Sequence, residues 1–270
     1  SETYYKFYAI RLANMKTQVV SPLREKINIA KENNFTFMEF GTRRRFSSEV
    51  QDKVCEILSK ECSNCVGTSN VYYAKKYGMK PLGTMAHEIF SFTAAHTSPR
   101  DANYIVMENW VDVYDGNLGT VLTDTFTVDE FLRQFSRKLA KLYDGVRHDS
   151  GDPFEFGDKI IEKYKSYGID PLSKTIIFSD SLDFPKCAEL KKYFDGRIKV
   201  SFGIGTCLSN DIKDPYVDTR IKPMNIVCKL TKMQVNPRQP VYGCVKLSDV
   251  PTKAMGTPED IAVYKYLVGC

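Results

Sequence analysis

Along this chain, short runs of apolar and β-branched residues alternate with longer stretches in which apolar residues recur every three or four positions. Short apolar runs between polar turns are typical of buried strands, and the longer spacing is typical of amphipathic helices. The pattern predicts strands over residues 35–40, 81–85, 120–123, 145–147, 175–178, 198–202 and 224–230, and a weaker strand over 65–67.

Helices are predicted between these strands. In residues 129–142, four apolar side chains are spaced to lie on one helical face: Phe131, Phe135, Leu139 and Leu142. Acidic residues in the first turn of this stretch and lysines in the last suit the helix dipole. Further helices are predicted over residues 1–14, 159–167 and 185–194.

The repeated order of strand, loop and helix predicts parallel strands joined by crossover helices, and therefore an α/β fold. About eight such units favour a (β/α) barrel over an open doubly wound sheet. We expect the barrel over residues 35–230. Residues 1–34 are expected to be a helical segment leading from a missing N-terminal α+β domain. Residues 231–270 are expected to pack on that domain, with a hairpin predicted over 229–250.

Polar groups follow the predicted strands, where the loops of a barrel carry its chemistry. Because these strand ends meet at one mouth, six such groups predict an active site there. They are Gly41-Thr42-Arg43, His87-Glu88, Asp124, Asp149, Ser179-Asp180 and Gly203-Ile204-Gly205-Thr206.

The stretch from Arg147 to Pro153 places an arginine, a histidine and two carboxylates on one loop broken by glycine and proline. Carboxylates bind Mg²⁺ or ribose hydroxyls, and arginine binds anionic oxygens, so this loop suits a sugar diphosphate. The same residues are also good turn formers, and both interpretations stay open.

His87 is one of three histidines, and no two of them have the spacing of a metal site. A nucleophilic or acid–base role is therefore favoured, with Glu88 as a partner that could fix the tautomer. The two glycines Gly203 and Gly205 could direct backbone N–H groups at a phosphate. Leu208 stands where a dinucleotide fingerprint needs glycine, so a monophosphate is favoured, and a tight turn explains the motif equally well.

Composition narrows the class of protein. The chain is 43% hydrophobic and 26% charged, as soluble globular proteins are, and it has no apolar run of the roughly 18 residues that a membrane span needs. We therefore expect a cytoplasmic protein without a membrane partner. The net charge of +5 is mild, and no basic stripe with interleaved aromatic residues predicts a nucleic-acid partner. Eight scattered cysteines favour free thiols over a disulfide framework.

Nine motifs stand in the order found in one enzyme family. They are EFGTRRRF, the Ser69-Asn70 pair after Gly67-Thr68, GTMAHE, LTDTF, GVRHDSGDP, FSDSLD, SFGIGT, IKPMNIVCKL and KLSD. In these motifs the chain resembles the nicotinate phosphoribosyltransferases along essentially its whole length. The family's N-terminal region has no counterpart here, so we expect a fragment of a longer enzyme.

The resemblance implies a type II phosphoribosyltransferase fold, an irregular α/β barrel beside a smaller α+β domain. It implies transfer of phosphoribosyl from phosphoribosyl pyrophosphate to nicotinate, giving nicotinate mononucleotide and pyrophosphate in NAD salvage. The family is ligase-like, because ATP hydrolysis is coupled through phosphorylation of the histidine that is His87 here. Mg²⁺ is expected through the substrate diphosphate, without a dedicated protein site. A homodimer is an expected assembly.

The resemblance also implies roles for individual residues. Catalysis would involve His87, Asp124, Arg147 and Asp149. Nicotinate would contact Phe40, Arg43, Ser69 and Thr84, with the ring stacked on Phe40. Phosphate and ribose would contact Arg44, Ser179, Asp180, Gly203, Gly205 and Thr206.

Two alternatives stay open. The sister enzyme that uses nicotinamide has an aspartate at the position of Ser69, and serine does not repel a carboxylate, so nicotinate is favoured. Quinolinate enzymes share the fold but lack the GTMAHE block. The second alternative is a catalytically silent fragment that only binds ligand.

Overall fold

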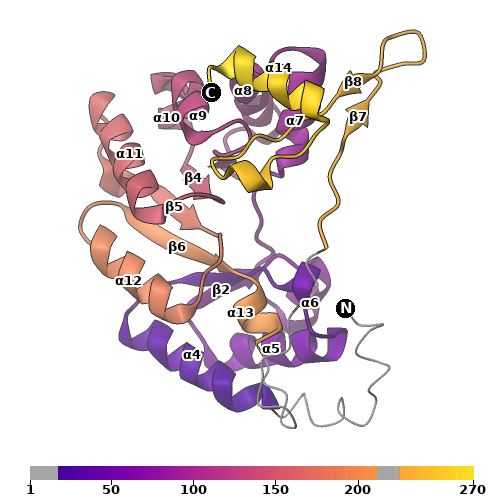
Figure 1. Cartoon of the computed structure of the whole chain (residues 1–270). Coiled ribbons are helices and arrows are strands. Elements are labelled where there is room, and N and C mark those ends of the chain that lie inside the picture. Colours follow the sequence, from indigo (N-terminus) through magenta and orange to yellow (C-terminus); the bar gives the residue numbers. More distant parts are fainter. Residues whose placement is uncertain (1–17, 212–222, 224–225) are drawn as a thin grey trace. The chain divides into compact units, whose positions relative to one another are not determined.

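The computed structural model describes residues 18–211, 223 and 226–270 (Figure 1). These residues divide into two compact units. The first unit contains residues 18–83, 178–195, 200–211, 223 and 226–227, and the second contains 84–177, 196–199 and 228–270. Each unit has parallel strands and packed helices, as the predicted α/β class requires.

The first unit is built on three parallel strands in the order β2-β1-β6: β1 (Phe37–Glu39), β2 (Cys65–Thr68) and β6 (Lys199–Ile204). Its helices are α4 (Val20–Glu32), η1 (Thr42–Arg44), α5 (Ser48–Glu61), α6 (Val71–Tyr77), α12 (Phe184–Phe194) and α13 (Thr206–Ser209). Helices α4 and α12 pack against each other. The core between helices and strands is aromatic, and the ring of Phe35 lies 5.3 Å from that of Phe202.

The second unit holds β3 (Thr120–Leu122), β4 (Gly145–His148) and β5 (Thr175–Phe178). β3 and β4 are parallel, and β5 lies beside β4, where Thr175 N donates to Asp144 O at 3.0 Å. A side chain at Gly145 would clash with the carbonyl of Thr175, so glycine is required there. The helices are α7 (His87–His96), α8 (Ala102–Tyr114), α9 (Val128–Gln134), α10 (Arg137–Leu142), α11 (Pro153–Ser166), η2 (Pro171–Ser173), η3 (Pro251–Lys253) and α14 (Pro258–Val268).

Most predicted strands form close to their expected positions. The predictions over 35–40, 65–67, 120–123, 145–147, 175–178 and 198–202 correspond to β1 to β6. The hairpin predicted over 229–250 is confirmed as the antiparallel pair β7 (Lys232–Met233) and β8 (Tyr242–Gly243).

Two strand predictions are wrong. Residues 81–85 form only a single bridge, between Pro81 and Thr68, in which Thr68 N donates to Lys80 O and Leu82 N donates to Thr68 O. Residues 226–230 are not a strand, and 224–225 lie outside the described residues. The helix predicted over 1–14 also lies outside them.

The helix predicted over 129–142 is two helices, α9 and α10. They separate at Ser136, whose Oγ accepts a hydrogen bond from Leu139 N and so caps the second helix. Apolar side chains before and at the break remain in contact: the rings of Phe131 and Phe135 stack with their centroids 4.8 Å apart. The helix predicted over 159–167 begins earlier, at Pro153, where Asp152 caps α11.

The boundaries of the two units differ from those of the predicted domains, 1–34, 35–230 and 231–270. The domain division remains a prediction. None of the described helices has the length and apolar character to cross a membrane. All eight cysteines lie within the described residues and are free thiols, and four of them are buried.

Candidate active site

His87 is the first residue of α7 and is buried, with 6% of its surface exposed. The sequence placed it at a strand end, and that placement is wrong because residues 81–85 form no strand. Its two ring nitrogens contact different groups. Nδ1 lies 3.1 Å from Thr125 Oγ1, and Nε2 lies 3.1 Å from Asp149 Oδ2 and 3.0 Å from Lys246 Nζ.

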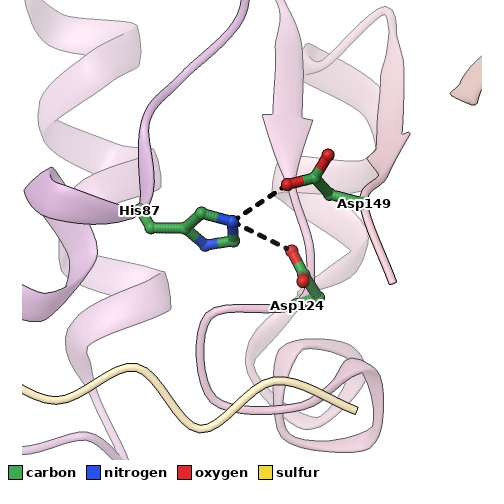
Figure 2. Close-up of side chains that lie close together, drawn as sticks. All are labelled: His87, Asp124 and Asp149. Atoms are coloured by element: carbon green, nitrogen blue, oxygen red, sulfur yellow. Dashed lines mark hydrogen bonds and ion pairs between the residues drawn. The ribbon is translucent and has the colours of Figure 1, made fainter. Parts of the chain in front are cut away.

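Two carboxylates face His87 Nε2 from neighbouring strand ends (Figure 2). Asp149 follows β4, and Asp124 follows β3 two residues after its end. Because β3 and β4 are parallel neighbours, their carboxyl ends lie at one edge. The Oδ1 atom of Asp124 lies 3.6 Å from Nε2, slightly farther than the nearest oxygen of Asp149.

Asp149 is held as an anion. Burial by itself raises the pKa of this carboxyl, but the hydrogen bond with His87 and the positive charge of Arg147 outweigh burial, and the pKa lies well below its ordinary value. Arg147 Nη2 donates to Asp149 Oδ1 at 2.8 Å, and its Nη1 donates to Thr84 Oγ1 at 2.7 Å. Arg147 therefore links Thr84 and Asp149 through two hydrogen bonds.

Asp124 is completely buried, with its charge compensated by a lysine. Ser150 Oγ donates to its Oδ2 at 2.7 Å, and Lys246 Nζ lies 3.4 Å from the same oxygen. Sequence reasoning did not assign a role to Lys246 or to Thr125. Both stand inside motifs that were noted, KLSD and LTDTF, and that was the only signal in the sequence.

This arrangement suits a nucleophilic imidazole. Nε2 has an acceptor, Asp149, and a donor, Lys246, within hydrogen-bond distance, so the tautomer decides which of them it engages. The Thr125 hydroxyl can donate to Nδ1 or accept from it, and thus fits either tautomer. A nucleophilic Nε2 would have an ammonium group beside it to offset incoming negative charge, and carboxylates to orient the ring.

The same cluster was tested as a metal site. His87, Asp124 and Asp149 each offer one ligand atom, and these atoms lie within 4.8 Å of one another. The ammonium group of Lys246, however, already contacts both His87 and Asp124. The ammonium group of Lys246 would therefore compete with a divalent ion for two of these three residues.

Glu88 is not the partner of His87 that the sequence suggested. Its Oε1 accepts from Lys229 Nζ at 2.9 Å instead. Burial raises the pKa of Glu88, but the Lys229 bond and the charges nearby outweigh it, and the pKa is lowered. The groups that orient His87 come from other segments of the chain.

In the first unit, Phe40 follows β1 and its ring covers Gly203. A Cβ atom at Gly203 would lie 2.6 Å from the Phe40 ring and 3.3 Å from Ser179 Cβ. Gly203 is therefore required for the packing of Phe40, whatever its role toward phosphate. Gly205 precedes α13, which begins at Thr206.

The other predicted residues of this unit lie on its strand-end loops. Arg43 is exposed and Arg44 is half-buried in η1, and Ser69 is exposed directly after β2. Burial and the charge of Arg43 lower the pKa of Arg44, while Asp180 acts in the opposite direction. Arg44 and Asp180 therefore lie close enough to interact. The roles proposed for these residues stay predictions.

Comparison with known proteins identifies the family. The sequence model of the nicotinate phosphoribosyltransferase (NAPRTase) family matches residues 35–267. The chain belongs to this family. The family is one of enzymes, and its match includes described residues of both units.

Individual members agree with this assignment. The nicotinate phosphoribosyltransferase of Methanosarcina mazei is 47% identical over 241 residues, which are 89% of this chain and 57% of the relative. That of Vibrio cholerae is 46% identical over 244 residues, 89% of this chain and 54% of the relative. The chain therefore spans about half the length of these curated relatives.

Solved structures confirm the fold class. The crystal structure of nicotinate phosphoribosyltransferase from Porphyromonas gingivalis matches with a TM-score of 0.94 and 44% identity, covering 100% of this chain and 68% of that one. The Vibrio cholerae structure gives 0.89 and 39%, covering 100% and 64%. The type II phosphoribosyltransferase fold predicted from the sequence motifs is therefore correct.

Proposed function

We propose that the protein to which this chain belongs transfers phosphoribosyl from phosphoribosyl pyrophosphate to nicotinate. The products are nicotinate mononucleotide and pyrophosphate, in the salvage of NAD. We also propose that ATP hydrolysis is coupled to this transfer through phosphorylation of His87. The observation that carries the proposal is the buried cluster of His87, Lys246, Asp124 and Asp149, in a chain of this family.

The transfer needs groups that stabilise a cationic ribose carbon. The pyridine nitrogen of nicotinate attacks C1′, the bond from C1′ to the diphosphate oxygen breaks, and pyrophosphate leaves with its electron pair. Carboxylates near the ribose favour this transition state over the ground state. Asp149 suits that role because its lowered pKa keeps it ionised. Mg²⁺ would enter with the diphosphate, neutralising the leaving group.

Phosphorylation of His87 would proceed at Nε2. Its lone pair attacks the γ-phosphorus of ATP, ADP leaves, and water later hydrolyses the phosphohistidine to release phosphate. Lys246, 3.0 Å from Nε2, would offset the added negative charge. The new charge beside Asp124 and Asp149 would alter the electrostatics of the whole cluster, which is how a phosphohistidine can change ligand affinity.

The first unit would supply binding groups. Phe40 would stack on the pyridine ring, and Arg43 would bind an anionic oxygen of nicotinate or phosphate, with Ser69 beside the ring substituent. The residues proposed for phosphate and ribose are Arg44, Ser179, Asp180, Gly203, Gly205 and Thr206. A cytoplasmic location and a homodimer belong to the same proposal.

Turnover by the complete protein tests the function. Nicotinate or nicotinamide is supplied with phosphoribosyl pyrophosphate and Mg²⁺, with and without ATP, and the mononucleotide and pyrophosphate are measured. We expect turnover of nicotinate that ATP increases. Preference for nicotinamide would identify the sister activity. Binding of nicotinate mononucleotide without any turnover would identify a silent ligand-binding protein.

A further inference from the structure

Glu39, the last residue of β1, is completely buried. Carboxylates are almost never fully buried without a partner. In the part of the chain that the structure describes, its partners are neutral donors rather than a cation. Burial raises the pKa of this carboxyl, and the hydrogen bonds from Thr68, Gly41 and Gln51 act in the opposite direction because they stabilise the ionised form.

Those hydrogen bonds join two strand-end loops. The Oε1 atom of Glu39 accepts from Gly41 N at 2.6 Å, and its Oε2 accepts from Thr68 Oγ1 at 2.7 Å. Gln51 Nε2, on α5, lies 3.1 and 3.2 Å from the two oxygens. The backbone carbonyl of Glu39 accepts from Ser69 N at 2.9 Å. One residue therefore contacts both the loop after β1 and the loop after β2.

A second set of contacts fixes the loops to each other. Thr42 Oγ1 accepts from Gln51 Nε2 at 2.8 Å and from Asn70 Nδ2 at 3.1 Å. Asn70 N in turn donates to Thr68 Oγ1 at 3.1 Å. Gly41 has no room for a side chain, because a Cβ atom there would lie 2.6 Å from Glu39 Oε1. The two loops are therefore joined both through the Glu39 side chain and directly through Thr42 and Asn70.

We infer that Glu39 is a positioning residue that sets the geometry of nicotinate binding. It holds the loop with Phe40 and Arg43 and the loop with Ser69, which are the residues assigned to the ring. The inference rests on the proposed function. Glu39 itself is buried behind these loops, so it acts through them and does not touch the substrate.

A carboxylate suits this position better than an amide does. Nitrogen donors that cannot accept face both of its oxygens: Gly41 N–H faces Oε1, and the amide nitrogen of Gln51 faces Oε1 and Oε2. The side chain of Glu39→Gln has a single acceptor oxygen, and its NH₂ group would face one of those donors. The variant keeps the shape of the residue and lets one loop move.

The test compares Glu39→Gln with a control in the same unit. Asn64 donates to the carbonyls of Ala30, in α4, and of Phe35, before the start of β1, so Asn64→Ala costs hydrogen bonds without freeing the loops. Steady-state constants and melting temperature are measured for both variants in the complete protein. We expect the KM for nicotinate to rise at least about tenfold in Glu39→Gln, with a smaller rise for phosphoribosyl pyrophosphate. In Asn64→Ala both KM values stay within about twofold of wild type.

Thr68→Val provides the test if Glu39→Gln does not fold, because it removes one donor to Glu39 and keeps the size of the side chain. The KM for nicotinate is then expected to rise about threefold. A lowered melting temperature with an unchanged KM for nicotinate would overturn the inference and leave Glu39 a structural residue. Failure of the wild-type protein to turn over nicotinate would instead refute the proposed function, and this inference with it.

Discussion

At the scale of single residues, the His87 cluster balances its charges. Asp149 is paired with Arg147, and Asp124 lies next to Lys246. Removing one member of a buried pair leaves an uncompensated charge, which is more costly than removing both. A single substitution in this cluster should therefore lower the free energy of unfolding more than a single substitution in an exposed ion pair does.

Phosphorylation is expected at His87 and at no other histidine. His96 provides a matched control, because it is exposed and its Nδ1 lies 2.9 Å from the carbonyl oxygen of Phe92 in the same helix. The complete protein is incubated with γ-labelled ATP, and acid-labile label is counted. His87→Asn should abolish the label, and His96→Asn should retain it. Label remaining in His87→Asn would disprove the assignment.

Asp149→Asn should impair catalysis at neutral pH. Loss of an ionised group that acts in the transition state costs about 2–4 kcal/mol in kcat/KM. The lowered pKa also makes a prediction about stability, because it means that the folded state favours the ionised form. That stabilisation is complete above the ordinary aspartate pKa of about 4 and is lost as pH falls through the lowered value.

Wild type should therefore be more stable than Asp149→Asn at pH 7, and this advantage should shrink as the pH falls below about 4. Urea unfolding of both proteins across this range measures the difference. A difference that does not depend on pH would show that the ionisation of Asp149 is not linked to folding.

Ring selectivity is expected to depend on Ser69, which is exposed at the end of β2. Ser69→Asp would place a carboxylate near that of nicotinate and offer an acceptor to the amide of nicotinamide. We expect affinity for nicotinate to fall at least about tenfold, or about 1.4 kcal/mol, and affinity for nicotinamide to fall less or to rise. Ser69→Asn, which adds no charge, is the control. An unchanged KM for nicotinate in Ser69→Asp would show that this residue does not face the ring.

At the scale of elements, parallel pairing brings the acidic residues together. Leu122 of β3 pairs with Arg147 of β4, so Asp124 and Asp149, each two residues beyond that pair, end at the same edge. The loop after β4 then leads directly into α11. Asp152 caps this helix, and its Oδ1 accepts from Phe154 N and Glu155 N. Asp152 therefore has a structural role as the N-cap of α11.

Asp152→Ala should accordingly act on stability. Loss of an N-cap costs about 1 kcal/mol, and kcat/KM should stay within about twofold of wild type. Glu162→Ala in the same helix is the control, because the exposed pair of Glu162 with Lys165 contributes little. Denaturant unfolding measures the capping role of Asp152, and steady-state kinetics would detect a role in catalysis. A large fall in kcat/KM without loss of stability would place Asp152 in the active site.

At the scale of the whole molecule, the family match runs from residue 35 to residue 267 and takes in strands of both units. The binding groups proposed for one substrate are thus distributed over segments far apart in the sequence. A ligand that binds only the folded chain stabilises it by an amount that grows with the logarithm of the ratio of ligand concentration to Kd.

Nicotinate mononucleotide should therefore raise the melting temperature of the complete protein. At a hundred times its Kd the expected stabilisation is about 2.7 kcal/mol. Nicotinamide mononucleotide serves as the comparison, with a smaller shift expected at the same concentration. Calorimetric titration gives the Kd directly. Equal shifts for the two mononucleotides would contradict selection for the carboxylate.

Local patterns in the sequence determined much of this protein. Apolar runs located the strands β1 to β6, and motifs at the ends of β3 and β4 pointed to Asp124 and Asp149. The GTMAHE motif pointed to His87, which begins α7. This succeeded because strand and helix periodicity is local, and because parallel strands necessarily end at one edge. Apolar spacing alone did not reveal the break at Ser136. The break arises because the Ser136 side chain caps the start of α10, and a capping hydrogen bond leaves no trace in the apolar pattern.

Only the tertiary structure decided which groups surround those residues. Lys246 contacts His87 although 159 positions of sequence separate them. Glu39 accepts hydrogen bonds from Thr68 and Gln51, which lie on other elements. Glu88, which follows His87 in the sequence, instead accepts a hydrogen bond from Lys229. Contacts of this kind depend on how remote segments pack, and no local spacing encodes them. The sequence therefore predicted which residues carry the chemistry, and packing determined the partners that orient them.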